Sequence, residues 1–310
     1  MRRFVLALAA LAVLPALAGP PRFVSLTFEN DFFAGYDRHY TNGLQAAWLV
    51  EREGLPVALR DLPPVRWSAD PDIVVALGQR IYTPTDLERE VPDPADRPYA
   101  GWLYLLADVR TRDGRVIDHL TAGVGVVGPA SGSRRVQDFA HRFIGQERAR
   151  GWRAQLGNEA TFMVGFERAW TGVAQGSFAG RSYDVALRAG AMAGNALTYA
   201  NAGAVLRYGE NLPSDIPTTH ISLGPSRDGY RGNPAGFGWY VWVGADGRAI
   251  GRNVFLDGLR RERYGHDWQA GAALAWPEAR IAFTLVERSA EFEGQRSPDR
   301  FGQLALSVAY

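Results

Sequence analysis

The sequence predicts an all-β fold: a twelve-stranded antiparallel transmembrane β-barrel with a short helix in an extracellular loop. The first observation is a period of two, because Leu304, Leu306, Val308 and Tyr310 alternate with small or polar residues and would share one face of a strand. The second is that Trp and Tyr often lie near the ends of such segments, where transmembrane barrels carry aromatic girdles. The third is the terminal Tyr310, which resembles the assembly signal of outer-membrane barrels.

The second face of these segments separates a barrel from a β-sandwich. A sandwich also alternates, but its outer face is rich in charge, whereas here the second face is mostly Gly, Ala, Ser and Thr. In the first strand, Val24, Leu26 and Phe28 would face lipid. The residues predicted to face the lumen are Ser25, Thr27, Glu29 and Asp31. The candidate girdle residues are Trp48, Tyr82, Tyr99, Trp102, Trp152, Trp170, Tyr208, Trp239, Trp268 and Trp276.

The N-terminus predicts export from the cytoplasm. Arg2 and Arg3 precede a short apolar run, which ends in the small residues around Ala18. This order is typical of a secretory signal peptide, and the run is too short to span a bilayer. We therefore expect a signal peptide at 1–18 and a single outer-membrane barrel domain at 19–310.

Twelve strands follow from the alternating segments. An even number puts both chain ends on the periplasmic side, so the connections at 84–96 and 129–153 are expected outside. The segment 211–235 fits poorly, because it is long and falls on the periplasmic side, which would be explained by a miscounted strand beside it. The expected strands are 22–32, 38–52, 71–83, 97–112, 115–128, 154–172, 176–193, 198–210, 236–248, 264–277, 278–291 and 300–310.

The composition excludes several classes of function. The 34 basic residues nearly balance the 33 acidic ones, so no nucleic-acid partner is expected. All basic residues are arginine, and the absence of cysteine excludes disulfides, thiolate metal sites and a cysteine nucleophile. The chain also has no P-loop, dinucleotide fingerprint or H-E-x-x-H zinc motif.

One segment breaks the period of two and predicts a helix. It ends at Gly145, which is the expected stop, and Ser131 or Ser133 is the expected N-cap. Gln137 and His141 are four residues apart and so share one helix face. The apolar residues at helical spacing are Val136, Phe139, Ala140, Phe143 and Ile144.

Two other segments are expected at the same membrane face as this helix. The first strand ends with Asn30 and Asp31, and the second begins around Thr41 and Asn42. Carboxylate, amide and hydroxyl groups would then converge near the His141 imidazole. The structural alternative is that the two asparagines only form Asx-turns that anchor the loops.

With these motifs in view, the chain resembles the LpxR family, outer-membrane lipid A 3'-O-deacylases of Gram-negative bacteria. Several motifs in a fixed order carry the resemblance, which covers nearly the whole mature chain. The motifs are Glu29-Asn30-Asp31, Tyr40-Thr41-Asn42-Gly43, Asp96-Arg97-Pro98-Tyr99-Ala100-Gly101-Trp102, Gly128-Pro129-Ala130-Ser131-Gly132, Gln137 with His141, Gly151-Trp152, Gly194-Asn195 and Arg252-Asn253-Val254-Phe255-Leu256-Asp257-Gly258.

The resemblance implies a fold, a substrate and a set of site residues. The fold would be a twelve-stranded barrel, expected here as a monomer among outer-membrane lipids. The reaction would be calcium-dependent hydrolysis of the ester that joins the 3'-linked acyloxyacyl chain to lipid A of lipopolysaccharide. The catalytic residues carried over are His141, Asn30, Asp31, Thr41, Gln137 and Glu147.

Physical chemistry is consistent with these roles. His141 suits a general base at neutral pH. A calcium ion (Ca²⁺) takes oxygen ligands, for which Asp31 and Glu147 are the candidates, and it would polarise the ester carbonyl. Asn30 or Thr41 could add a hydrogen-bond donor for the oxyanion. The nucleophile is either a water molecule, which we favour, or the Thr41 hydroxyl.

Other interpretations stay open from the sequence. An outer-membrane phospholipase would need a serine nucleophile, but Ser131 and Ser133 match no such motif. A pore or structural barrel would not need the site residues at all. His39 is a weaker candidate for the site. Six arginines crowd the helix loop, either as a solvated face or as ligands for lipid A phosphates. They are Arg134, Arg135, Arg142, Arg148, Arg150 and Arg153.

Overall fold

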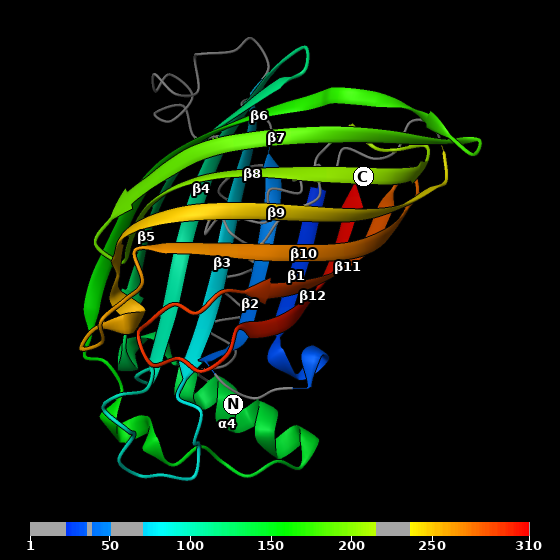
Figure 1. Cartoon of the computed structure of the whole chain (residues 1–310). Coiled ribbons are helices and arrows are strands. Elements are labelled where there is room, and N and C mark those ends of the chain that lie inside the picture. The colour runs from blue at the N-terminus through cyan, green and yellow to red at the C-terminus, as the bar shows by residue number, and fades with distance from the viewer. Residues whose placement is uncertain (1–22, 36–38, 51–70, 215–235, 310) are drawn as a thin grey trace.

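The computed structural model describes residues 23–35, 39–50, 71–214 and 236–309. Within them, twelve antiparallel strands form a closed barrel in which β1 pairs with β12, as predicted (Figure 1). The strands are β1 (Phe23–Asn30), β2 (His39–Val50), β3 (Asp72–Thr83), β4 (Ala100–Asp113), β5 (Val116–Val127), β6 (Glu159–Phe178), β7 (Arg181–Gly194), β8 (Leu197–Glu210), β9 (Gly238–Asn253), β10 (Tyr264–Ala275), β11 (Ala279–Arg288) and β12 (Asp299–Ala309). The predicted signal peptide and Tyr310 lie outside these residues.

The helix α4 (Ser133–Ile144) connects β5 to β6 and marks one end of the barrel, which we call the α4 end (Figure 1). Among the described residues, four short 3₁₀ turns lie at this end or beside α4. They are η1 (Asp31–Ala34), η3 (Pro129–Ser131), η4 (Gly151–Ala154) and η5 (Val254–Leu256). The described hairpins at the opposite end are tight, such as the turn at Gly114. No helix in the described ranges is long and apolar enough to cross a membrane.

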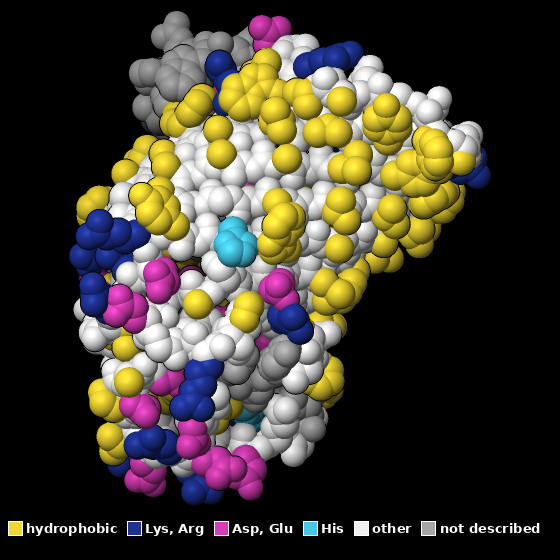
Figure 2. Space-filling model, viewed as in Figure 1, with side chains coloured by type: hydrophobic (Ala, Val, Ile, Leu, Met, Phe, Trp, Pro, Cys, Tyr) yellow, Lys and Arg dark blue, Asp and Glu magenta, His cyan; other side chains and the backbone are white. Residues whose placement is uncertain are grey.

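The barrel wall is apolar outside and polar inside, as the alternation predicts. On β1, Leu26 and Phe28 are exposed, whereas Ser25, Thr27 and Glu29 are buried in the lumen. Apolar side chains cover much of the visible wall, and charged side chains gather at the α4 end (Figure 2). This distribution matches a barrel whose wall faces lipid.

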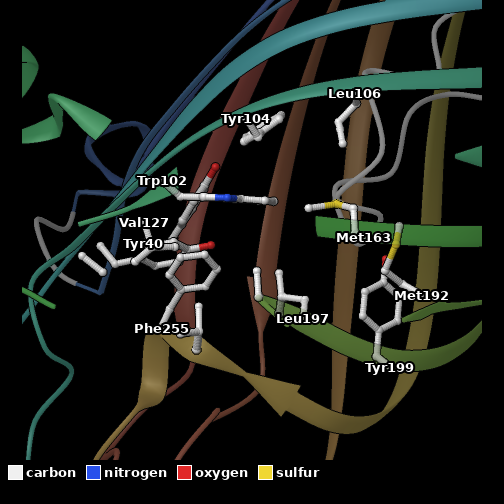
Figure 3. Close-up of a cluster of buried hydrophobic side chains, with 14 of the residues drawn as sticks. Tyr40, Trp102, Tyr104, Leu106, Val127, Met163, Met192, Leu197, Tyr199 and Phe255 are labelled. Carbon is white, nitrogen blue, oxygen red and sulfur yellow. The ribbon is translucent and has the colours of Figure 1, made fainter. Parts of the chain in front are cut away.

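Ion pairs and aromatic rings fill much of the lumen. Arg188 pairs with Asp246, and Asp267 accepts hydrogen bonds from Arg248 at 2.7 Å and Arg288 at 2.9 Å. Nearer the α4 end, the side chains of Tyr40, Tyr82, Trp102, Tyr104 and Phe255 pack in a buried cluster, most of which Figure 3 shows. These contacts give no support to an open, water-filled pore.

The hairpin between the sixth and seventh strands lies later in the chain than predicted. The sequence predicted strands at 154–172 and 176–193, but β6 continues to Phe178 and the hairpin turns at Ala179. Gly172, at the predicted end of the sixth strand, instead lies in a bulge of β6 with a φ of 58°. β8 and β9 pair directly, so the barrel order agrees with the predicted strand count there, and 215–235 lies outside the described residues.

Four of the ten predicted girdle residues are wrong. Tyr82, Tyr99, Trp102 and Trp152 are buried, because they pack in the lumen or beneath α4 instead of facing lipid. Trp48 is also buried, but it lies on the same side of β2 as the exposed Leu44. Aromatic contacts at the end opposite α4 fit the girdle better. They are Phe178 with Tyr208, Tyr208 with Trp239, and Phe237 with Trp276.

Candidate active site

A bulge at the start of β2 buries three consecutive side chains. The pairing of β2 with β3 skips one residue between Tyr40 and Asn42, and His39, Tyr40 and Thr41 are all buried. A regular strand would turn the middle residue to the other face, so the bulge redirects these side chains. Thr41 Oγ1 lies 2.6 Å from Thr83 Oγ1. The bulge therefore fixes the predicted Thr41 at the barrel rim, against the end of β3.

The predicted Asn-Asp pair lies where β1 ends. Asn30 caps η1, because its Oδ1 accepts a hydrogen bond of 2.8 Å from the Phe32 amide. Asp31 begins η1 and is buried. Across the sheet, Asn30 is paired with Asn42, the neighbour of Thr41. The turn-anchoring role expected as an alternative is therefore present at Asn30, and the buried Asp31 carboxylate follows directly.

Helix α4 buries polar side chains and exposes large apolar ones. Ser133, Gln137 and His141 lie at successive turns and are all buried. Phe139 and Phe143 are 51% and 84% exposed. The apolar residues at helical spacing therefore do not form the buried face, contrary to the usual pattern of a helix packed on a core.

The residues at the ends of α4 let the helix pack closely against the barrel. Its N-cap is Gly132 and not a serine, because the Ser131 hydroxyl already donates to the Gly128 carbonyl at 2.6 Å. A Cβ at Gly101 on β4 would lie 2.3 Å from Ser131 Oγ, so only glycine permits this approach. Gly145 ends the helix with a φ of 75°, as predicted. The serine hydroxyl is thus structural, which removes support for a serine nucleophile.

His141 is held by one ring nitrogen. Its Nδ1 lies 2.5 Å from the backbone carbonyl oxygen of Glu147. Because a carbonyl only accepts, Nδ1 carries the proton and the neutral ring has its lone pair on Nε2. Within the described part of the chain, Nε2 has no hydrogen-bond partner, although the side chain is only 5% exposed. In this arrangement Nε2 can accept a proton, as a general base does.

Gln137 lies one helical turn before His141 and is fixed from the other side. Trp152 Nε1 donates to Gln137 Oε1 at 2.6 Å, and the Trp152 ring packs against Tyr99 at 5.0 Å. Gln137 Nε2 is buried without a partner among the described residues. The inner face of α4 therefore presents one base and one amide donor that no described residue satisfies.

The predicted residues fall into two groups at the α4 end. Asn30, Asp31 and Thr41 lie on the rim at β1 and β2, whereas α4 packs on β3 and β4. In the described residues His141 bonds only to the Glu147 carbonyl. No hydrogen bond therefore joins His141 directly to Asp31 or to Thr41.

The two predicted calcium ligands lie in different surroundings. Asp31 is 3% exposed, whereas the Glu147 side chain is 78% exposed and its carboxylate lies 3.7 Å from Arg150. No set of three or more His, Asp or Glu residues that could hold a metal is present in the described ranges. The oxygen donors suit calcium in type, but two carboxylates need carbonyl and water ligands to complete six to eight.

The sequence underestimated His39, which lies at the centre of a buried polar cluster. Its Nδ1 is 2.6 Å from Asp299, and its Nε2 is 3.2 Å from both Asp96 and Thr85 Oγ1. Burial acts to raise the pKa of Asp96, but hydrogen bonds from His39, Thr85 and Arg97 outweigh it and lower that pKa well below its usual range. The cluster ties β2 and β12 to the β3–β4 loop.

The motif at 96–102 is structural throughout. Arg97 donates to Glu291 at 2.6 Å, and Trp102 donates to Thr161 Oγ1 at 3.0 Å. Burial favours the neutral Glu291 carboxyl, but Arg97 and neighbouring arginines lower its pKa below the usual value. The spacing of residues in this motif does not distinguish structural residues from catalytic ones. The structural role of the motif was therefore not predictable from the sequence.

Comparison with known proteins agrees with the geometry. The family model described as "Outer membrane protein LpxR" matches residues 4–310. LpxR from Salmonella typhimurium has a similar structure with a TM-score of 0.76 at 19% identity, over 93% of this chain and 100% of that one. The β domain of the Bordetella autotransporter BrkA gives a TM-score of 0.45 at 9% identity, over 93% and 98%. None of the curated proteins matches this chain.

The family match covers almost every residue of the chain, and the similar barrel spans the full length of its relative. The closed barrel and its apolar wall agree with a location in the outer membrane. This chain is therefore an outer membrane protein and belongs to the LpxR family.

Proposed function

We propose that this protein hydrolyses the ester that links the 3'-linked acyloxyacyl chain to lipid A. One observation carries the proposal: the buried His141 has its Nδ1 proton bound by the Glu147 carbonyl and its Nε2 without a partner in the described residues. The Nδ1 hydrogen bond fixes the ring and leaves the Nε2 lone pair open to a substrate, which favours a catalytic role for His141.

The mechanism uses His141 as a general base. Nε2 takes a proton from a water molecule as that water attacks the ester carbonyl, and it later returns the proton to the leaving alkoxide. The Glu147 carbonyl stabilises the imidazolium that forms between these steps. Gln137 Nε2, held in position through Trp152, can donate to the reacting water or to the developing oxyanion.

The geometry favours water over Thr41 as nucleophile. Thr41 Oγ1 lies 2.6 Å from Thr83 Oγ1 and has no hydrogen bond to His141. A threonine nucleophile needs its base within hydrogen-bond reach. Thr41 is better suited to binding substrate or to donating a hydrogen bond at the rim.

Calcium is part of the proposal because the rim supplies oxygen donors. Asp31 would hold the ion, with Glu147 as the second carboxylate after it leaves Arg150. Bound there, calcium would act as a Lewis acid that polarises the ester carbonyl. Asn30 and Thr41 are the neighbouring side chains that could complete or orient this site.

The surroundings of the site suit a lipid substrate. Phe32 on η1 and Phe143 on α4 are 68% and 84% exposed, and the adjoining wall is apolar (Figure 2). Exposed aromatic side chains of this kind provide contact for acyl chains at a membrane surface. A lipid of the outer leaflet could thus reach the rim laterally, without entering the lumen.

The test is mass spectrometry of lipid A from cells that express this chain, with calcium or with a chelator. We expect calcium-dependent loss of the 3'-acyloxyacyl group, and no loss with His141→Ala. His266→Ala is the matched control, because His266 is exposed on β10, away from α4. Unchanged lipid A with the barrel folded in the outer membrane would refute the proposal, and phospholipid hydrolysis would then be tested on the same membranes.

A further inference from the structure

A cavity of about 570 Å³ lies beside α4, between the helix, the segment 148–154 and the β3–β4 loop. The backbone holds this arrangement, because the Arg150 amide donates to the Leu87 carbonyl at 2.9 Å. The residues that line it are Glu90, Val91, Arg134, Asp138, Arg148, Ala149, Arg150, Arg153 and Ala154. Four of the six arginines noted in the sequence therefore surround one space.

The arginines of this cavity exceed their acidic partners. Arg134 lies 3.8 Å from Asp138, and Arg150 lies 3.7 Å from Glu147. In the described part of the chain, Arg148 and Arg153 have no ion pair or hydrogen bond through their guanidinium groups. Counting only the lining side chains, four arginines face Glu90 and Asp138, a surplus of two positive charges.

We propose that this cavity binds a phosphate monoester carried by the glycolipid substrate. A phosphate monoester bears close to two negative charges at neutral pH, which matches the surplus. Guanidinium groups bind phosphate through paired N–H donors, and two unpaired arginines supply such donors. The proposal rests on the proposed function, since it names the part of the substrate head group that this loop recognises.

The position of the cavity gives the bound phosphate a role in orientation. Arg134 and Asp138 each neighbour, along α4, the face that carries Gln137 and His141. On the other side, Arg148 directly follows Glu147, whose carbonyl holds His141. A phosphate fixed here would hold the sugar head group at a set distance from the His141 base, which lowers the entropic cost of reaction.

The experiment compares two double variants of the whole protein in detergent. Arg148→Gln/Arg153→Gln removes the two unpaired cavity arginines. Arg135→Gln/Arg142→Gln is the matched control, because both residues are exposed on α4 and do not line the cavity. Each pair is placed in the His141→Ala background, so that binding of lipid A is measured without turnover and does not depend on deacylation.

We expect the cavity variant to bind phosphorylated lipid A roughly tenfold more weakly or worse, and the control pair to bind it almost as the parent does. Lipid A stripped of phosphate by a phosphatase should bind the parent and the cavity variant equally. Inorganic phosphate serves as a second probe. If millimolar phosphate competes with lipid A for binding, the cavity is a general phosphate site; if it does not, binding needs the attached lipid.

Two results would overturn the proposal. Equal losses in both double variants would mean that general charge attraction, and not the cavity, binds the lipid. Undiminished binding of dephosphorylated lipid A to the parent would exclude phosphate as the ligand. If the binding contrast holds but the protein with His141 intact leaves lipid A uncleaved, the phosphate site stands and the proposed hydrolase function fails. Circular dichroism and heat-modifiable gel migration check folding of each variant.

Discussion

The lumen and the α4 loop differ in whether their charged and polar side chains are paired. In the lumen, Arg188 pairs with Asp246, and Arg288 pairs with Asp267 at 2.9 Å. On α4 and its loop, His141 Nε2 and the Arg148 guanidinium have no partner in the described residues. The lumen pairs satisfy one another and so hold the barrel together, whereas the α4 groups remain available to a ligand.

The contrast has an energetic meaning. A buried polar group without a partner costs about 1–3 kcal/mol, and Gln137 Nε2 on α4 is such a group among the described residues. In the lumen, Asp246 and Asp267 are paired with arginines, although Arg80 Nε is also buried without a partner in the described residues. The groups of the α4 end differ in lying at the rim, where the substrate of the proposed reaction could complete their hydrogen bonds.

The largest expected effect is on catalysis by the unpaired base. His141→Ala should lower kcat by about 10²- to 10⁴-fold, the usual contribution of a general base. The free energy of unfolding should change little, because the side chain makes a single hydrogen bond to a carbonyl. Rates on purified lipid A and unfolding in urea are the two measurements. If His141→Ala unfolds at a lower urea concentration than the parent but keeps its rate, His141 would be a structural residue and not the base.

The paired region should respond in the opposite way. Asp246→Ala would leave Arg188 buried without its counter-ion, and such losses destabilise by about 3–5 kcal/mol. Activity per folded molecule should stay near that of the parent. The double variant Arg188→Met/Asp246→Leu is the control, because replacing both charges by apolar groups is often nearly neutral. Urea unfolding, monitored by tryptophan fluorescence, measures the stability of both variants. A loss of activity in Asp246→Ala without a loss of stability would contradict the prediction.

The sequence predicted the architecture well, because membrane-spanning strands obey a simple rule. The alternation around Leu26 and Phe28 correctly placed their neighbours Ser25 and Thr27 in the lumen. Gly145 correctly ended the helix, since its φ of 75° is a conformation that glycine adopts freely. Local rules of this kind depend on nearest neighbours alone and need no knowledge of tertiary contacts.

The roles of buried aromatic and polar residues were not predictable in the same way. Trp102 and Trp152 look like girdle residues, yet both are buried and hydrogen-bonded. Helix α4 looks like an ordinary amphipathic helix, yet Gln137 is buried and Phe143 is exposed. The errors at Trp152 and α4 arise because the loop of α4 folds back on the barrel, and the error at Trp102 arises because that ring packs into the lumen cluster. These tertiary contacts leave no periodic trace in the sequence.

A smaller effect is expected where the unpaired face is held in position. Trp152→Phe removes the donor that fixes Gln137 Oε1, which should lower activity about 3- to 10-fold, in line with a hydrogen bond of about 0.5–1.5 kcal/mol. Trp102→Phe is the matched control, because it removes a similar bond, to Thr161 in the lumen. The control should lose stability and keep its rate. Equal losses of rate in both variants would refute the positioning role of Trp152.

The smallest expected effect concerns a paired group that lies outside the lumen. Because hydrogen bonds from His39, Thr85 and Arg97 hold the pKa of Asp96 well below its usual range, its ionised carboxylate stabilises the β3–β4 loop at neutral pH. This contribution is complete above the unfolded pKa of about 3.9. It is lost as the pH falls from there towards the lower folded pKa.

Hydrogen exchange of the amides in 84–99 can measure this contribution. Protection should not decrease between pH 7 and pH 5 and should fall only below about pH 4, since the unfolded pKa sets the upper limit of the window for Asp96. Asp96→Asn should weaken protection at pH 5 and 7, and its difference from the parent should shrink in acid. Asp93→Asn is the control, because Asp93 is exposed and accepts a local hydrogen bond from Ala95. A loop that opens already between pH 7 and pH 5 would show that Asp96 does not hold it, and that pairing at the α4 end is weaker than in the lumen.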